Sequence, residues 1–300
     1  MHPSLVLLAP GFFANEPVRT ALAVGGWAAL VAAVVGVFTV VRGQTFAGHA
    51  LADVSSAGGS ASFLLGVSPL LGFLGMATIA AAGMEWADIR DARERDVVTG
   101  IVLGAGLGLA ALMLYFDSTL GSTSGAAITI LFGSMFAVGP AIVPLALGVG
   151  AAAIAIVGTI YRPLLVSSLS ADLAAAQGTR VRIMGLLHAL ALALAVSLSA
   201  LTVGAMLSTA LLIGPAATGL RLADRPARAL ALAVLTGLAA TWLGILLAYD
   251  SYYWTPGYGW PVSFFIVSLL FVFYLLANLA SRRARTGSHT AQRARLADGS

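Results

Sequence analysis

Long uncharged stretches separated by short charged segments dominate the pattern of hydrophobic and polar positions along the chain. A helix needs about 20 residues to cross the hydrocarbon core of a bilayer. Stretches of that length predict single membrane spans, and the longer ones must be divided by other signals. The stretches without Asp, Glu or Arg are residues 20–41, 54–84, 97–116, 118–161, 183–220, 229–249 and 251–281.

The arginines divide these stretches into spans. Loops rich in arginine lie on the cytoplasmic side of a membrane, so an even number of spans must separate one arginine group from the next. A hairpin of two helices in each interval, plus one helix before the first group, predicts an all-α integral membrane protein with about nine transmembrane helices. Fifteen of the 16 arginines form five groups: Arg42; Arg90, Arg93 and Arg95; Arg162, Arg180 and Arg182; Arg221, Arg225 and Arg228; and Arg282, Arg283, Arg285, Arg293 and Arg295.

This parity also predicts orientation. The N-terminus is expected outside a cell (plasma or inner) membrane and the C-terminus in the cytoplasm. Outer turns are expected near residues 67–69, 117–124, 202–206 and 250–261, none of which contains arginine. We expect a transmembrane domain over residues 1–281 and a basic, disordered cytoplasmic tail over residues 282–300 that faces anionic lipid.

Composition excludes several classes of protein. With 59% apolar residues, 9% charged residues and a mean hydropathy of +0.96, the chain is unlike a water-soluble domain. All 16 basic residues are arginine, and the absence of lysine excludes P-loop nucleotide hydrolysis and Schiff-base chemistry in this polypeptide. The absence of cysteine excludes thiolate metal ligands. The net charge of +4 reflects the arginine loops and gives no reason to expect nucleic-acid binding.

The strongest chemical signal lies in RGQTFAGHALADVSSAGG, residues 42–59. Two spans need about 40 residues, but the uncharged stretch 54–84 supplies 31, so the second helix must begin upstream, near Phe46. His49 and Asp53 are then drawn into a membrane helix at i, i+4 spacing, on one face. Imidazole and carboxylate together suit zinc or manganese. The alternatives are that Asp53 only orients His49, or that both side chains sit in headgroup water.

Two further ionisable residues have competing interpretations. His188 follows the cytoplasmic Arg180 and Arg182 and is predicted to be a packed or interfacial histidine rather than a ligand. Asp250, at the expected outer end of the eighth helix, could attract cations at an extracellular mouth. An exposed loop acid within an aromatic belt is the competing interpretation.

Two cytoplasmic segments are candidate docking surfaces. In LLIGPAATGLRLADRPARA, Pro215 is expected to begin a short helix that lies flat on the membrane and carries force from a partner. An ordinary helix–turn–helix with cytoplasmic arginines fits the same spacing. LLVSSLSADLAAAQGTRVR, residues 164–182, predicts an amphipathic cytoplasmic helix. The docking residues expected in the first segment are Pro215, Ala216, Ala217, Thr218, Arg221 and Asp224.

Over most of its length the chain resembles the permease subunits of ATP-binding-cassette importers for zinc, manganese and iron. In that family's arginine-led motif an acidic residue precedes a histidine by four positions, whereas here His49 comes first and Asp53 second. Five segments are similar to family elements and stand in the family's order: TVVRGQTFAGHALADVSSAGG, ITILFGSMFAVG, SADLAAAQG, ALLIGPAATGLRLADR and SYYWTPGYGWPVSFFIV.

The resemblance implies a type II importer fold: a homodimer of permeases, two separate ABC ATPase subunits and an extracytoplasmic metal-binding protein. It implies that residues 215–224 form the ATPase coupling helix and that His49 and Asp53 bind the transported metal transiently. The imidazole favours zinc first, with manganese next. No stably bound cofactor is expected, and the permease itself is not an enzyme. A secondary metal/proton transporter or channel without an ATPase is the alternative, and a membrane metalloenzyme is a third class that no HExxH motif supports.

Overall fold

The computed structural model describes residues 11–86, 92–119, 125–169, 180–254 and 258–297. Within these residues nine helices have 18 residues or more, in agreement with the number expected from the arginine groups. They are α1 (Glu16–Val41), α2 (Thr45–Leu65), α3 (Pro69–Trp86), α4 (Ala92–Thr119), α6 (Val143–Leu169), α8 (Val181–Val203), α9 (Ala205–Leu222), α10 (Pro226–Trp254) and α11 (Val262–Ala297).

Eight of these nine described helices are long and apolar enough to cross a membrane, and the exception is α2. Helix α2 differs because His49, Asp53 and several serines interrupt its apolar sequence. Its beginning at Thr45 agrees with the expected start near Phe46. Among the nine long helices, the one with the least apolar 18-residue stretch is therefore the one that carries the candidate ligands.

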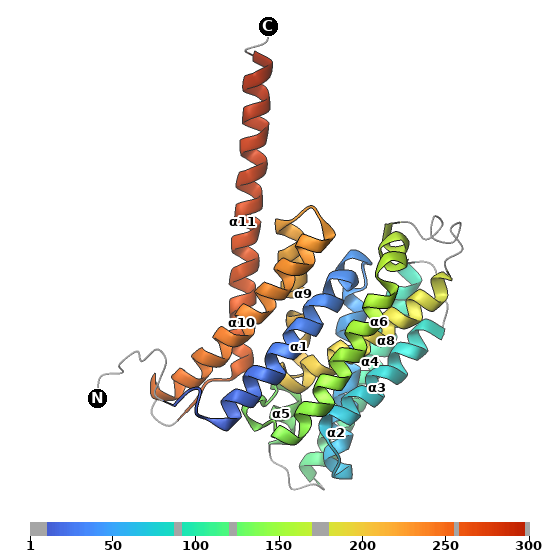
Figure 1. Cartoon of the computed structure of the whole chain (residues 1–300). Coiled ribbons are helices and arrows are strands. Elements are labelled where there is room, and N and C mark those ends of the chain that lie inside the picture. Colours follow the sequence, from blue (N-terminus) through green and yellow to red (C-terminus); the bar gives the residue numbers. More distant parts are fainter. Residues whose placement is uncertain (1–10, 87–91, 120–124, 170–179, 255–257, 298–300) are drawn as a thin grey trace.

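Successive long helices run in opposite directions through one bundle (Figure 1). The ends of α1, α3, α6 and α9 lie at the same face as the beginnings of α2, α4, α8 and α10, and α11 extends beyond the bundle at that face. The arginine-bearing ends of the helices therefore share one face, as the parity argument requires. The α2–α3 turn, the end of α4 and the α8–α9 turn belong to the opposite face.

The stretch of 44 uncharged residues contains one long helix rather than two. It holds the short helix α5 (Ala126–Phe132), the 3-10 turns Met135–Ala137 and Pro140–Ile142, and then α6. Gly133 ends α5 with a positive φ of 76°, a backbone conformation that glycine adopts without steric strain. The extra residues therefore form a partial segment at the face opposite the arginine ends.

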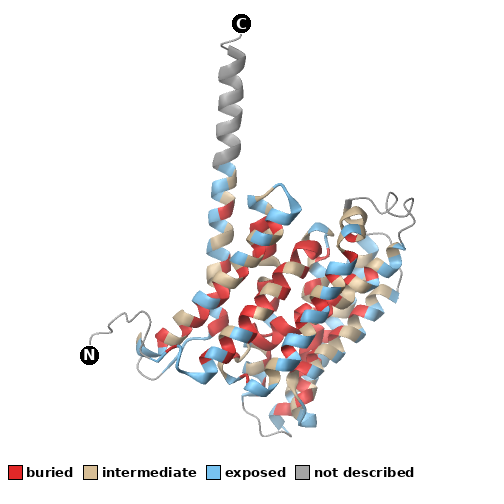
Figure 2. Ribbon diagram, viewed as in Figure 1, coloured by how far each residue is buried: buried red, intermediate tan, exposed pale blue. Residues whose placement is uncertain are grey.

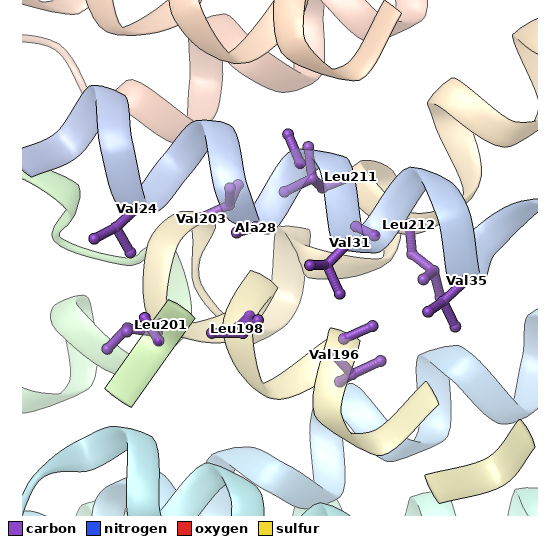
Figure 3. Close-up of a cluster of buried hydrophobic side chains, with 14 of the residues drawn as sticks. Val24, Ala28, Val31, Val35, Val196, Leu198, Leu201, Val203, Leu211 and Leu212 are labelled. Atoms are coloured by element: carbon purple, nitrogen blue, oxygen red, sulfur yellow. The ribbon is translucent and has the colours of Figure 1, made fainter. Parts of the chain in front are cut away.

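The core lies around α1 and α8. Both helices are largely buried, as the red ribbon in Figure 2 shows, whereas α3, α4, α6 and α10 keep one side exposed. Valines and leucines of α1, α8 and α9 interlock in the centre (Figure 3), with Val31, Leu198 and Leu211 at 0% exposure. Lipid provides no hydrophobic drive for helix association, so close packing of such side chains holds the helices together.

Small residues bring α2 close to its neighbours. A Cβ on Gly58 would overlap the carbonyl oxygen of Gly72 in α3, and a Cβ on Gly106 in α4 would overlap the Val54 side chain. Both contacts flank the turn of α2 that carries Asp53. The glycines thus fix the depth and rotation of this helix in the bundle.

The structure bears on three further expectations. Pro215 does not begin a helix, because α9 runs through it from Ala205 to Leu222. Neighbouring helices enclose this proline, and such packing lets membrane helices tolerate one. The segment 282–297, for which a disordered tail was expected, continues α11 as helix. Of the predicted amphipathic helix 164–182, residues up to Leu169 belong to α6, and 170–179 lie outside the described residues.

Candidate metal site

A tight turn after α1 sets the position of the candidate site. Arg42 caps α1, and Gly43 follows with a positive φ of 66°, so the chain reverses direction within three residues. Helix α2 then begins at Thr45, which places His49 in its second turn and Asp53 one turn further. The local sequence therefore directs both side chains to one face near the arginine-bearing end of the bundle.

The two predicted ligands lie together. His49 Nε2 is 3.5 Å from Asp53 Oδ2. The Asp53 side chain is 10% exposed and that of His49 is 42% exposed, so the pair is open on the imidazole side. A cation approaching from that side would meet a ring nitrogen and a carboxylate oxygen, a donor set that zinc and manganese both accept.

Thr209 in α9 holds the other ring nitrogen. Its Oγ1 lies 3.0 Å from His49 Nδ1. The tautomer with the proton on Nδ1 donates to Thr209 and leaves the Nε2 lone pair beside Asp53. A second group that fixes the tautomer and ring orientation in this way is typical of metal-binding histidines.

Close packing supports the turn that carries His49. Gly48 faces α9, where an added Cβ would stand 2.9 Å from a methyl group of Leu212. At the α1–α2 turn, Arg42 donates to Gln44 Oε1 at 3.2 Å and to Ser167 Oγ of α6 at 3.1 Å. Burial lowers the pKa of the Arg42 guanidinium, an effect that Glu85 opposes and Arg95 reinforces. Arg42 thus ties the start of α2 to α6.

Only two strong donors meet here. No group of three or more His, Asp or Glu side chains that could hold a metal ion occurs in the part of the chain that the structure describes. A site with one imidazole and one carboxylate leaves most of a metal's coordination to water or to another chain. Such a site suits transient binding better than permanent retention.

The remaining histidine prediction is confirmed and the Asp250 prediction is not. His188 is fully buried in α8, as expected for a packed histidine. Asp250 is also fully buried, within α10, so it is neither an exposed loop acid nor open to solvent at a mouth. The uncharged stretch ends at this residue because it is acidic, but the helix continues to Trp254.

The predicted docking residues separate into two groups. Arg221 and Asp224 are exposed where α9 ends, and Arg221 donates through Nε (3.2 Å) and Nη2 (2.9 Å) to Asn278 Oδ1 of α11. The other four belong to the body of α9: Pro215, Ala216 and Thr218 are buried, and Ala217 is half-buried. A partner could therefore reach only the last turn and the loop of the predicted segment directly.

Sequence reasoning missed Thr209. No spacing signal connects it to His49, since it reaches the site only through the packing of α9 on α2. It also missed Ser56 and Ser60, which follow Asp53 at three and seven residues and so share its helix face. That spacing was visible in the sequence.

Comparison with known proteins gives concordant results. The sequence model of a family described as the ABC 3 transport family matches residues 14–278 of this chain. The chain is 28% identical over 278 residues to the manganese import system permease protein ScaB of Streptococcus parasanguinis, covering 92% of this chain and 94% of the relative. It is 27% identical to the high-affinity zinc uptake system membrane protein ZnuB of Haemophilus influenzae, covering 77% and 88% of the two chains.

A solved structure agrees in fold. PsaBC from Streptococcus pneumoniae, in complex with Fab, superposes with a TM-score of 0.76 at 26% identity, over 89% of this chain and 92% of that one. The family match spans all nine long helices up to Asn278, including the α2 turn with His49 and Asp53. The chain belongs to the ABC 3 transport family.

Proposed function

We propose that this chain is the membrane permease subunit of an ATP-driven importer of a divalent transition metal, with His49 and Asp53 as the transport site. The observation that carries the proposal is the His49–Asp53 pair, 3.5 Å apart on a membrane helix and open on one side. Ionisable groups inside a membrane usually mark a substrate pathway. Family membership supports the ATP-driven class over a secondary transporter or channel.

Zn²⁺ and Mn²⁺ are the candidate substrates. Several similar proteins carry manganese in their names and one carries zinc, which supports both metals. The ranking of zinc before manganese stays a prediction. One imidazole nitrogen among oxygen donors does not discriminate strongly, so competition between the two ions during uptake is the appropriate measurement.

The assembly proposed is a pair of permease chains with separate ABC ATPases on the arginine-bearing face and an extracytoplasmic metal-binding protein on the other. The absence of lysine requires that the nucleotide be hydrolysed by another chain. The positive-inside rule places the arginine-bearing face and the end of α11 in the cytoplasm. The half-exposed imidazole of His49 would then face the space between protomers or a pore.

Uptake of metal by the reconstituted complex tests the transport site. His49→Ala or Asp53→Ala removes one of the two donors. Loss of a group that only supports a metal ligand typically lowers metal affinity or activity by about tenfold or more, so loss of a ligand itself should lower uptake at limiting metal by more than about tenfold. The exchange variant His49→Asp with Asp53→His keeps both donors on one face and should recover part of the uptake. Binding of ATP by the assembled complex should be unchanged in all three.

Ser55→Ala is the matched control for this experiment. Ser55 lies on the same helix and is fully buried, but its hydroxyl bonds to the Ala52 carbonyl oxygen on the face away from His49. This variant should transport at the parental rate. Parental uptake by both alanine variants at limiting metal would contradict the proposed site.

A further inference from the structure

A polar stripe continues from the transport site along α2. Thr45, His49, Asp53, Ser56 and Ser60 recur every three or four residues and therefore share one helix face. With a rise of about 1.5 Å per residue, Ser60 lies about 10 Å beyond Asp53, toward the α2–α3 turn. This is the face of the bundle from which an imported ion would arrive.

An acidic residue meets the stripe at Ser60. The Ser60 hydroxyl donates to Asp117 Oδ2, which α4 supplies from its last turn. Ser60 is fully buried and Asp117 is 2% exposed. The second carboxylate oxygen, Oδ1, is also buried and has no hydrogen-bond partner within the described part of the chain.

A buried carboxylate with a single serine partner is incompletely satisfied. Burial strongly disfavours an ionised carboxylate unless an opposite charge or several hydrogen bonds compensate. No arginine or histidine among the described residues forms an ion pair with Asp117. The second carboxylate oxygen therefore keeps an unused acceptor position, and its serine partner stands on the same face of α2 as His49 and Asp53.

We propose that Asp117 and Ser60 form an outer, weak cation site at which the imported metal pauses before it reaches His49 and Asp53. This proposal rests on the transport function proposed above. A carboxylate and a hydroxyl are hard oxygen donors, which accept a partly hydrated divalent ion. Weak binding at two successive sites lets an ion enter without being retained.

Counting bound Mn²⁺ tests the outer site. The permease, assembled with its ATPase in lipid nanodiscs, is titrated with Mn²⁺ alone, and the free ion is measured by electron paramagnetic resonance. The parent should bind two ions per permease chain. Asp117→Asn keeps the shape and the acceptor for Ser60 but removes the charge, so it should bind one ion and raise the half-saturating metal concentration for uptake several-fold, with the maximal rate little changed.

Two further variants separate the possible explanations. Ser60→Ala removes the hydrogen bond but leaves the charge, and it should still bind two ions, one of them more weakly. His49→Ala should lose the inner ion and keep the outer one. Two bound ions and a parental half-saturating concentration in Asp117→Asn would overturn the outer site. If His49→Ala kept both ions while Asp117→Asn lost one, the transport site would be wrong and the outer site would stand.

Discussion

The Thr209 hydroxyl matters at the residue scale because it controls which nitrogen of His49 is free. Thr209→Val keeps the size of the side chain but removes the partner 3.0 Å from Nδ1. We expect the half-saturating metal concentration for uptake to rise by roughly tenfold, because groups that orient a metal-binding histidine contribute effects of this size. The measurement is uptake against metal concentration, with half-saturation and maximal rate determined separately.

Thr209→Ser is the control, because it restores the hydroxyl while removing only a methyl group. In this variant the half-saturating metal concentration for uptake should be close to that of the parent. If the valine and serine variants behaved alike, Thr209 would act through packing on α2 rather than through its bond to His49.

At the scale of elements, Gly106 of α4 determines how closely this helix approaches α2. In Gly106→Ala the new Cβ overlaps Val54, next to Asp53, whereas Gly108 has no atom within 4 Å of such a Cβ. Overpacking of this kind costs about 1–3 kcal/mol. Gly106→Ala should therefore lower the midpoint of thermal unfolding in detergent and reduce uptake.

Gly108→Ala on the same helix is the matched control. It should leave both quantities unchanged or raise the midpoint slightly, since alanine favours helix more than glycine does. Equal effects of the two substitutions would mean that helix propensity, not the approach of α4 to α2, decides the outcome.

The end of α9 is the second element with a testable role. If the exposed turn around Arg221 contacts an ATPase, Arg221→Glu should reduce the ATP hydrolysis that accompanies transport by reversing a charge at the contact, with membrane insertion unchanged. Asn278→Ala distinguishes an ATPase contact of Arg221 from its hydrogen bonds to α11, because this variant removes the acceptor on Asn278 but keeps the positive charge of Arg221. Equal loss in both variants would assign Arg221 to holding α9 against α11.

The sequence predicted where the helices lie more successfully than it predicted which side chains are buried. Grouping the arginines predicts nine helices, and the shortness of stretch 54–84 places the start of α2 upstream of His49. The same method treats each acid as the boundary of a span, so it puts Asp117 and Asp250 in outer turns, whereas both are buried inside helix ends. Charge alone does not show whether a neighbouring helix encloses a side chain. Tertiary packing, which brings Thr209 to His49, is likewise absent from local spacing.

At the scale of the whole molecule, orientation follows from the shared position of the arginine-bearing helix ends. Nine crossings put the start of α1 and the end of α11 on opposite sides, as their places in Figure 1 indicate. An ATPase can reach the α9–α10 loop only if that loop is cytoplasmic. Importer function, the odd number of helices and the distribution of arginines therefore all predict that the arginine-bearing face lies in the cytoplasm.

Thiol labelling of intact cells tests this orientation, and the chain is suited to it because it contains no cysteine. Tyr258 is 77% exposed in the segment between α10 and α11, and Arg225 is exposed between α9 and α10. Tyr258→Cys should react with a membrane-impermeant maleimide added outside, and Arg225→Cys should react only after the membrane is permeabilised. The permeabilised sample is the control for accessibility of both thiols. Labelling of Arg225→Cys in sealed cells would reverse the orientation and with it the side assigned to the ATPase.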